Sequence, residues 1–432
     1  MPHGPDFERR VVVTGMGAVT SLGAGHEHNW RQLLEGKSGV RRIRRFDPST
    51  FPVHIASEIY PLPRVPEDDV TDELGIHTRF ALIAGREAWA DAGLDGADVP
   101  GHRVGVFVGS GKGILVLERL VSASVAALED GGAFNFAKFI EDSRTSLVAE
   151  SRKEERYHQA GTYLGRAFGA TGPNWVCITA CAAGNHALGE GMWAIRRGMA
   201  DVVVAGGTHS QIDPMSVSGY STLGALSENN AEPHRASRPF DKARDGFILA
   251  EGSGMLVLEE LEHAQTRGAN VLAEIVGYGN TGDSYRVTDP HPEGVGAETA
   301  MRNALASAGL SPSDIGYINA HGTSTSQNDA QESQAIVRIF GPKGEAPPVS
   351  SIKSMLGHLV AAAGAVEAMT CVHALREGIL PPTMNYENPD PACALDYIPN
   401  EAREQKINYA MNNSFGFGGQ NIVTIFRRWN GS

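Results

Sequence analysis

The sequence predicts an α/β fold made of two similar halves. Short apolar runs typical of buried strands alternate with alanine-rich stretches that have helical spacing, and this alternation indicates largely parallel sheets. An internal repeat relates the first part of the chain to the last. The length of 432 residues is enough for two such halves to bury a large core.

Three pairs of segments carry the repeat. AGREAWADAGL at residues 84–94 resembles AMRNALASAGL at 300–310, and both are predicted helices that end at a glycine. Each helix precedes a predicted strand, at 104–111 in one half and 315–324 in the other. Alanine-rich helices at 182–198 and 359–378 form the third pair. We therefore expect halves 1–265 and 266–432, with an insertion within about 112–170 that the second half lacks.

The predicted strand that begins at Val11 runs into a glycine-containing stretch, TGMGAVTSLG, which we interpret as a turn. A glycine-rich turn after a strand occurs in dinucleotide-binding proteins. Here the third glycine of that fingerprint is replaced by Thr20, and no acidic residue follows a second strand at the required distance. The pattern therefore disfavours a nicotinamide-dependent oxidoreductase.

Composition limits the class of protein. The net charge of −13 disfavours a nucleic-acid partner. Four scattered cysteines form no disulfide framework, and neither a signal peptide nor a membrane-length apolar run is visible, so we expect a cytoplasmic protein. A local basic cluster, read either as a solvated loop or as a docking patch for an acidic partner, contains Arg41, Arg42, Arg44 and Arg45.

The segment CITACAAGNHALG, residues 177–189, places two cysteines four residues apart. Cys177 lies on a predicted strand and is interpreted as a small core residue. Cys181 lies at the turn into the alanine-rich helix, where the helix N-terminus favours a reactive thiolate. We expect no metal site, because His186 is the only further ligand nearby.

Three segments of the second half offer the proton donors and charge-stabilising groups that a thiolate nucleophile requires. NAHGTST places His321 after a strand, among small and hydroxyl residues. SIKSMLGH places Lys353 and His358 before an apolar helix, where packing requires neither. NSFGFGGQN, residues 413–421, is a glycine-dense turn that carries Phe415 and Phe417.

With these motifs in this order, the chain resembles the β-ketoacyl-acyl carrier protein synthases of the elongating KAS I/II type, a group in the thiolase superfamily that includes the type II polyketide ketosynthases. The resemblance covers nearly the whole chain. Its segments are VVVTGMGAVTSLG, ITACAAGNHALGEG, DVVVAGG, SRPFDKARDGF, AEGSGMLVLE, NAHGTSTSQND, SIKSMLGHLVAAAGAVE and NSFGFGGQN. It implies a thiolase-like fold in which two pseudo-duplicated halves form a layered α-β-α-β-α architecture.

The resemblance also implies roles for the site residues. Cys181 would accept an acyl chain from a carrier protein, while His321 and His358 would stabilise the enolate left when the malonyl extender loses carbon dioxide. Lys353 would orient the second histidine. The N–H groups of Cys181 and Phe417 would form the oxyanion hole, with Phe417 also acting as a gate. Further residues implied are Thr323, Thr325, Phe415 and Lys112 as substrate contacts, and Glu367, Asn319, Asn412 and Asn413 as a structural or cation site.

The implied partner is an acyl carrier protein whose phosphopantetheine carries the substrates, so no further cofactor is expected beyond a structural monovalent cation. A homodimer is expected, or a heterodimer with a second ketosynthase-like subunit. The alternative function is a non-elongating partner or scaffold subunit. Three departures from the family pattern bear on chain preference and carrier docking and leave primary fatty-acid synthesis and a secondary-metabolite pathway both open: Lys112, the charged segment 141–159, and Gly224.

Overall fold

The computed structural model of the chain describes residues 9–65, 74–111, 117–146 and 156–431. The main strands of the first half are β1 (Val11–Thr20), β5 (Val104–Ser110), β6 (Asn174–Cys177), β7 (Val202–His209) and β8 (Gly252–Glu260). Those of the second half are β9 (Ala273–Gly282), β10 (Tyr317–Asn319), β11 (Val349–Ser350), β14 (Tyr409–Gly416) and β15 (Gln420–Arg428). Each first-half strand therefore has a counterpart in the second half, in the same chain order.

The two sets of strands also share one spatial order. The strands run β11-β10-β14-β15-β9-β1-β8-β7-β5-β6, so the arrangement β6-β5-β7-β8-β1 of one half reappears as β11-β10-β14-β15-β9 in the other. Two residue pairs, Val12 with Glu274 and Val13 with Ala273, join the halves through β1 and β9. The predicted internal repeat is confirmed by this topology.

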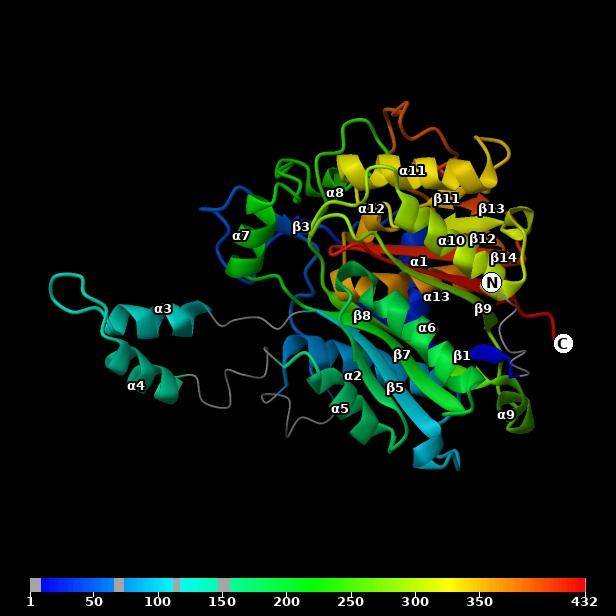
Figure 1. Cartoon of the computed structure of the whole chain (residues 1–432), viewed down its shortest axis with the longest axis horizontal. Coiled ribbons are helices and arrows are strands. Elements are labelled where there is room, and N and C mark those ends of the chain that lie inside the picture. The colour runs from blue at the N-terminus through cyan, green and yellow to red at the C-terminus, as the bar shows by residue number, and fades with distance from the viewer. Residues whose placement is uncertain (1–8, 66–73, 112–116, 147–155, 432) are drawn as a thin grey trace.

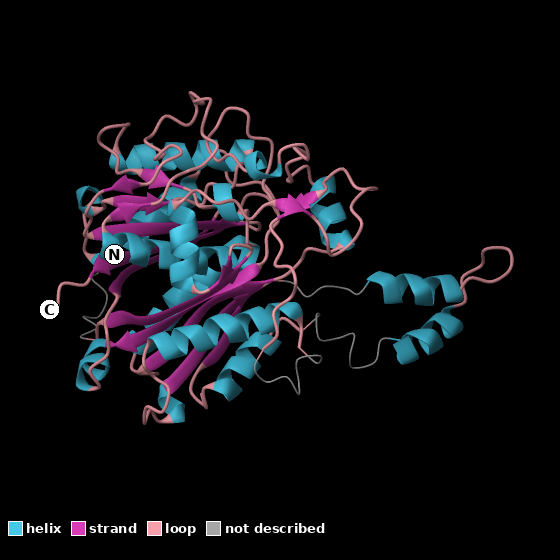
Figure 2. Ribbon diagram, turned by 180° about the vertical axis from the view of Figure 1, so that it is seen from behind, coloured by secondary structure: helices cyan, strands magenta, loops and turns pink. Residues whose placement is uncertain are grey.

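Helices cover both outer faces of the strands and fill the space between the halves (Figure 1). On one side α2 (Ile76–Asp91) packs on β1, β7 and β8, beside α5 (Gln159–Ala167). On the other side α10 (Val295–Ala308) packs on β9 and β15, beside α11 (Ser326–Phe340). Between the halves, α6 (Ala183–Arg196) contacts α13 (Ala363–Glu377). Figure 2 shows the same layers from behind, and the α-β-α-β-α architecture is confirmed.

The expectation of largely parallel sheets is wrong, because five of the nine pairings along the order of the described strands are antiparallel. β5 pairs in parallel with β6 and β7, but β7–β8 and β8–β1 are antiparallel. The second half repeats this pattern, with β14–β15 and β15–β9 antiparallel. The parallel neighbours follow one another through covering helices, whereas β15 returns from β14 through a three-residue turn, and such a direct return reverses the strand direction.

The glycines of TGMGAVTSLG do not form the turn that we predicted, because β1 continues through them as far as Thr20. A Cβ atom at Gly15 would lie 2.1 Å from the carbonyl oxygen of Ala88, and one at Gly17 would lie 2.0 Å from that of Ala84. Both carbonyls belong to α2. These glycines therefore allow a helix to pack directly on the strand backbone.

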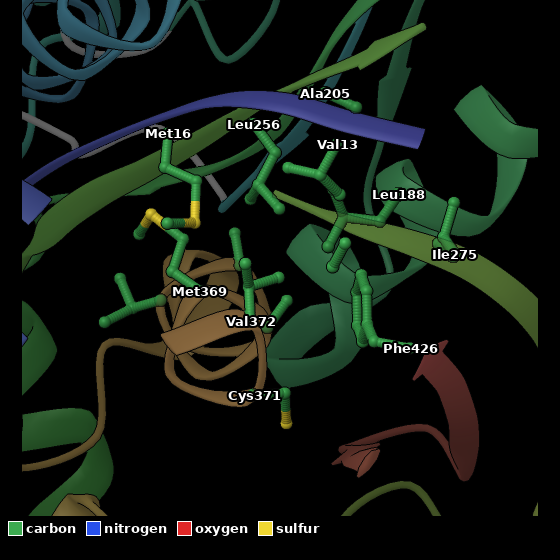
Figure 3. Close-up of a cluster of buried hydrophobic side chains, with 14 of the residues drawn as sticks. Val13, Met16, Leu188, Ala205, Leu256, Ile275, Met369, Cys371, Val372 and Phe426 are labelled. Carbon is green, nitrogen blue, oxygen red and sulfur yellow. The ribbon is translucent and has the colours of Figure 1, made fainter. Parts of the chain in front are cut away.

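The largest core cluster lies where the two central helices meet the strands (Figure 3). Leu188 of α6 and Val372 of α13 are fully buried in it, together with Val13, Leu256 and Phe426 from three strands. Full burial of such a side chain contributes roughly 1.5–3 kcal/mol. This packing fixes the positions of the N-termini of α6 and α13, and both of these termini border the candidate site.

The predicted insertion contains α3 (Leu117–Ala126) and α4 (Phe136–Ser146), a helical hairpin that projects away from the body (Figures 1 and 2). Its exposed apolar side chains include Val121, Val125, Leu128, Phe136 and Ile140. The charged segment 141–159 begins on α4, but residues 147–155 lie outside the described part of the chain.

Shorter elements complete the fold. They are α1 (His26–Leu34), α7 (Pro214–Thr222), α8 (Pro233–Ala236), α9 (Leu261–Thr266), α12 (Lys353–Leu356), β2 (Gly23–Ala24), β3 (Arg41–Arg42), β4 (Ile55–Ala56), β12 (Ile379–Leu380) and β13 (Arg403–Glu404). Among the described residues, no helix combines the length and the apolarity needed to cross a membrane.

Candidate active site

A cavity of about 260 Å³ lies between the two halves of the fold. The first half contributes Cys181 to its wall, and the second half contributes His321, His358, Phe415 and Phe417. The structure therefore brings the candidate nucleophile together with the two histidines, although more than a hundred residues of sequence separate it from either of them.

Cys181 lies in a short 3-10 turn, η4 (Ala180–Ala182), between β6 and α6. The turn begins with Ala180 at φ 47°, a value that is uncommon for residues other than glycine. Cys181 is a free thiol with 7% of its surface exposed. Cys177 is also free and buried, at the end of β6, as predicted for a packing residue.

The ionisation of Cys181 differs from the sequence-based expectation of a thiolate. Burial raises the pKa of the Cys181 thiol to about 11, although the Lys353 ammonium and the N–H groups of Phe417 and of Cys181 itself lower it. The N-terminus of α6 alone does not keep Cys181 in the thiolate form, because the sulfur is removed from water. The thiol must therefore lose its proton when it reacts. The two N–H groups of the predicted oxyanion hole, those of Cys181 and Phe417, both favour negative charge on this sulfur.

His321 follows β10 and is held by its backbone. Its N–H group donates to Oε1 of Glu332 at 2.8 Å, and the N–H group of Gly322 donates to Oε2 at 2.8 Å. Nδ1 of His321 is buried and has no hydrogen-bond partner within the described part of the chain. One imidazole nitrogen is thus left without a protein partner at the cavity.

His358 precedes the second 3-10 turn, η6 (Val360–Ala362), which leads into α13. The N–H group of Val360 donates to Nδ1 of His358 at 3.3 Å, so the neutral ring carries its proton on Nε2. The rings of His358 and His321 lie 5.3 Å apart, nearly perpendicular. Burial and the Lys353 ammonium lower the pKa of both histidines well below the usual value, so both are neutral near pH 7.

Lys353 and Glu367 form a buried ion pair beside these histidines, with 2% of each side chain exposed. Nζ of Lys353 donates to Glu367 Oε1 and, at 2.6 Å, to the carbonyl oxygen of His321. We expected Lys353 to orient the second histidine, His358, but its hydrogen bond goes to the first. Lys353 opens α12, and its side chain reaches the loop that carries His321.

The glycine-dense C-terminal turn lies against the turn that carries Cys181. A Cβ atom at Gly416 would lie 2.7 Å from the carbonyl oxygen of Thr179 and 3.2 Å from the backbone nitrogen of Cys181. Only glycine allows this approach. Phe415 is buried and packs 5.7 Å from the His321 ring, and Phe417 is partly exposed at the cavity wall.

Of the predicted substrate contacts, Thr323 and Thr325 line the cavity, and their hydroxyl oxygens lie 2.8 Å apart. Gly224 lines it as well. Lys112 lies outside the described residues, so its predicted contact stays a prediction.

The asparagines predicted for the cation site point to two different faces of the sheet. Nδ2 of Asn319 donates to the carbonyl oxygen of Glu367, and Nδ2 of Asn412 donates to that of Gly364, so both face α13. Asn413 instead donates to Glu332. Buried oxygens of this region that have no hydrogen-bond partner within the described part of the chain are Asn319 Oδ1, Asn412 Oδ1, Asn413 Oδ1, Glu367 Oε2 and Ser414 Oγ.

Two acidic residues of α11 support the site but are absent from the sequence prediction. Glu332 anchors the His321 loop, and burial raises its pKa to about 7. Asp329 accepts from the N–H groups of Phe240 and Ser324. Their spacing of three residues, which places both on one face of a helix directly after the NAHGTST segment, was the available signal.

Comparison with known proteins agrees with this geometry. Residues 8–264 match the family model described as the β-ketoacyl synthase N-terminal domain, and residues 272–387 match the corresponding C-terminal domain. The chain is 42% identical to 3-oxoacyl-[acyl-carrier-protein] synthase 2 of Coxiella burnetii, over 98% of this chain and 99% of that protein.

Solved structures are similar in fold as well. The ishigamide ketosynthase/chain length factor matches with a TM-score of 0.85 and 33% identity, over 98% of this chain and 100% of that one. A type II PKS acyl-carrier protein in complex with its ketosynthase, bound to the hexaketide, matches with a TM-score of 0.83 and 34% identity, over the same shares. The chain belongs to the β-ketoacyl synthase family.

Proposed function

We propose that this protein is an elongating β-ketoacyl-acyl carrier protein synthase that forms a carbon–carbon bond by decarboxylative condensation. The observation that carries the proposal is the shared cavity, in which a thiol with two N–H groups on its sulfur faces two neutral imidazoles. This set offers a nucleophile, an oxyanion site and hydrogen-bond donors for an enolate.

The first step is transfer of an acyl chain to Cys181. The thiol is protonated at rest, so its proton passes to a neutral imidazole as the sulfur attacks the carrier thioester. The N–H groups of Cys181 and Phe417 stabilise the oxyanion. Collapse of that intermediate forms the acyl-Cys181 thioester and releases the carrier thiol, which takes up the proton.

The second step uses a malonyl thioester. Nε2–H of His358 and the imidazole of His321 hold the thioester carbonyl oxygen. The bond between the α-carbon and the carboxylate breaks, carbon dioxide leaves, and the electron pair of that bond forms an enolate whose charge lies on this oxygen. The enolate carbon attacks the carbonyl carbon of acyl-Cys181. The sulfur leaves with its electron pair, and the product is a β-ketoacyl thioester on the carrier.

An acyl carrier protein is the proposed donor of both substrates. Thr323 and Thr325 at the cavity wall supply hydroxyl groups that fit the amides of a phosphopantetheine arm. Two members of the basic cluster are committed elsewhere, since Arg44 pairs with Glu58 and Arg45 with the buried Glu251. Arg41 and Arg42 on β3 are exposed and are the better candidates for an acidic carrier, since Arg42 makes only a 4.0 Å contact with the exposed Asp47.

The projecting α3–α4 hairpin supports an oligomer, either a homodimer or a heterodimer with a second ketosynthase-like subunit. Its exposed Val125, Phe136 and Ile140 present an apolar surface that solvent disfavours. The described ishigamide assembly contains a ketosynthase and a chain length factor.

A structural monovalent cation is proposed beside the catalytic residues. The unpartnered oxygens of Asn319, Asn412, Glu367 and Ser414 fit such an ion, because alkali cations bind carbonyl, hydroxyl and carboxylate oxygens. The ion would coordinate these buried oxygens, which have no other partner among the described residues, and stiffen the contact between α13 and β14. Asn413 is not included, because it faces Glu332.

Acyl transfer to Cys181 tests the function. Wild-type protein incubated with an acylated acyl carrier protein should gain the mass of one acyl group on the peptide that contains Cys181. Cys181→Ala should show no acyl mass and no condensation, while malonyl decarboxylation stays measurable. Cys177→Ala is the matched control and should behave like wild type. Condensation by Cys181→Ala at the wild-type rate would exclude Cys181 as the nucleophile. Wild-type protein that gains no acyl mass and does not condense would support the alternative, a non-elongating partner or scaffold subunit.

A further inference from the structure

Tyr220 lies at the wall of the active-site cavity, near the end of α7. Its ring packs edge-to-face on Phe247 at 5.5 Å, and Phe247 packs in the same way on His358 at 5.3 Å. Tyr220 also packs against the hydrophobic cluster that contains Cys181. The ring is therefore fixed between the nucleophile and the histidine that holds the extender.

The hydroxyl group of Tyr220 has no hydrogen-bond partner among the residues that the structure describes. Burial, with Cys181 and Asp213 nearby, raises the pKa of Tyr220 well above its usual value, so the hydroxyl keeps its proton and can donate it. The apolar residues packed with Tyr220 in one cluster at the cavity include Ala225, Phe247 and Val360.

The cavity also has polar lining residues. Thr323, Thr325 and Asn328 line the part that we assign to the carrier arm. The Tyr220 side is then left for the acyl chain. A saturated hydrocarbon placed there would strip water from the hydroxyl without replacing its hydrogen bond, which is unfavourable. An oxygen substituent on the chain would restore the bond.

We propose that Tyr220 is a specificity-determining residue whose hydroxyl donates a hydrogen bond to an oxygen on the third carbon of the chain held by Cys181. Each condensation leaves a carbonyl at that carbon. The chain extended here therefore arrives as a 3-oxo- or 3-hydroxyacyl thioester, from a sequence that does not fully reduce the product of the preceding condensation. This inference rests on the proposed function.

The test compares Tyr220→Phe, which removes only the hydroxyl, with wild type. The substrates are octanoyl and 3-hydroxyoctanoyl thioesters of phosphopantetheine, and the readout is the rate of acylation of Cys181 by intact-protein mass. Wild type should prefer the 3-hydroxy chain, and the ratio of the two rates should fall about tenfold in Tyr220→Phe, since a site built for a hydroxyl discriminates against its absence. Tyr163→Phe, outside the cavity, is the matched control and should keep the wild-type ratio.

Two results would overturn the proposal: a wild-type enzyme without preference for the 3-hydroxy chain, or an unchanged ratio in Tyr220→Phe. The first result needs no variant, so a folding defect cannot obscure the answer. Failure of the proposed function gives a different outcome, because neither thioester would then acylate Cys181.

Discussion

Cys181 and Ala361 occupy equivalent positions in the two halves of the fold. Each is the middle residue of a 3-10 turn that leads into a central helix, and the preceding residue has nearly the same φ, 47° at Ala180 and 46° at Val360. The two turns are in contact. The start of α6 is also close to the second turn, since a Cβ atom at Gly184 would lie 2.8 Å from the carbonyl oxygen of Ala361. Duplication thus built two similar turns around one cavity, with the thiol in one and His358 just before the other.

The Lys353–Glu367 pair should be required for folding as well as for catalysis. Lys353→Met would leave the Glu367 carboxylate and the His321 carbonyl buried without their donor. Breaking a buried pair on one side costs roughly 3–5 kcal/mol, so the free energy of unfolding in urea should fall by about that amount. Lys37→Met is the control, because Lys37 pairs with Glu35 at the exposed surface and should change little. Equal stability of both variants would contradict the prediction.

The raised pKa of Cys181 predicts how its alkylation depends on pH. Below a pKa of about 11 the thiolate fraction grows tenfold for each unit of pH, so the rate of reaction with iodoacetamide should rise almost tenfold per unit between pH 7 and 9. Mass spectrometry of the peptide 177–189 separates Cys181 from Cys177 by fragmentation. A rate that levels off below pH 8 would instead show a stabilised thiolate in the resting enzyme.

The proposed cation should stabilise the folded protein. The thermal midpoint should be higher in potassium chloride than in choline chloride of equal ionic strength, by about 1 °C for each kcal/mol of binding free energy. Asn412→Leu removes one of the unpartnered oxygens and should abolish the difference. Asn135→Leu changes a half-buried asparagine at the start of α4, outside the cation site, and should preserve the difference. Identical midpoints of wild type in the two salts would contradict the cation site.

The sequence allowed the repeat, the order of the motifs and the joining of Cys181 with His321, Lys353 and His358 to be predicted. These depend on short local patterns, strand ends and helix starts, which the fold then brings together. The predicted turn at Gly15 and Gly17 failed because a glycine that admits a neighbouring helix looks the same in sequence as one that bends the chain. The prediction of parallel pairings failed because strand direction depends on the path that the chain takes between strands.

Long-range electrostatics explain the remaining differences at the site. The protonated state of Cys181 follows from burial by Val360 and other residues distant in sequence, which a helix-end argument does not include. The role of Glu332 depends on its contact with two backbone N–H groups ten and eleven residues away. The bond from Lys353 to the His321 carbonyl has no local sequence signal, because any lysine opening such a helix would look the same.

Gly416 should be as important to the oxyanion hole as the residues that form it. In Gly416→Ala the new methyl group would meet the Thr179 carbonyl oxygen at 2.7 Å and the Cys181 nitrogen at 3.2 Å, so the end of β14 must move away from η4. Phe417 would move with it, and its N–H group would leave the Cys181 sulfur. Loss of one oxyanion donor costs about 10²–10³ in rate, so condensation should fall by that factor. Gly282→Ala is the control. A Cβ atom at Gly282 would lie 4.0 Å from the nearest atom, the carbonyl oxygen of Gly419 in the C-terminal turn, so the methyl group fits without a shift. Wild-type condensation by folded Gly416→Ala would exclude the Phe417 N–H group as a donor.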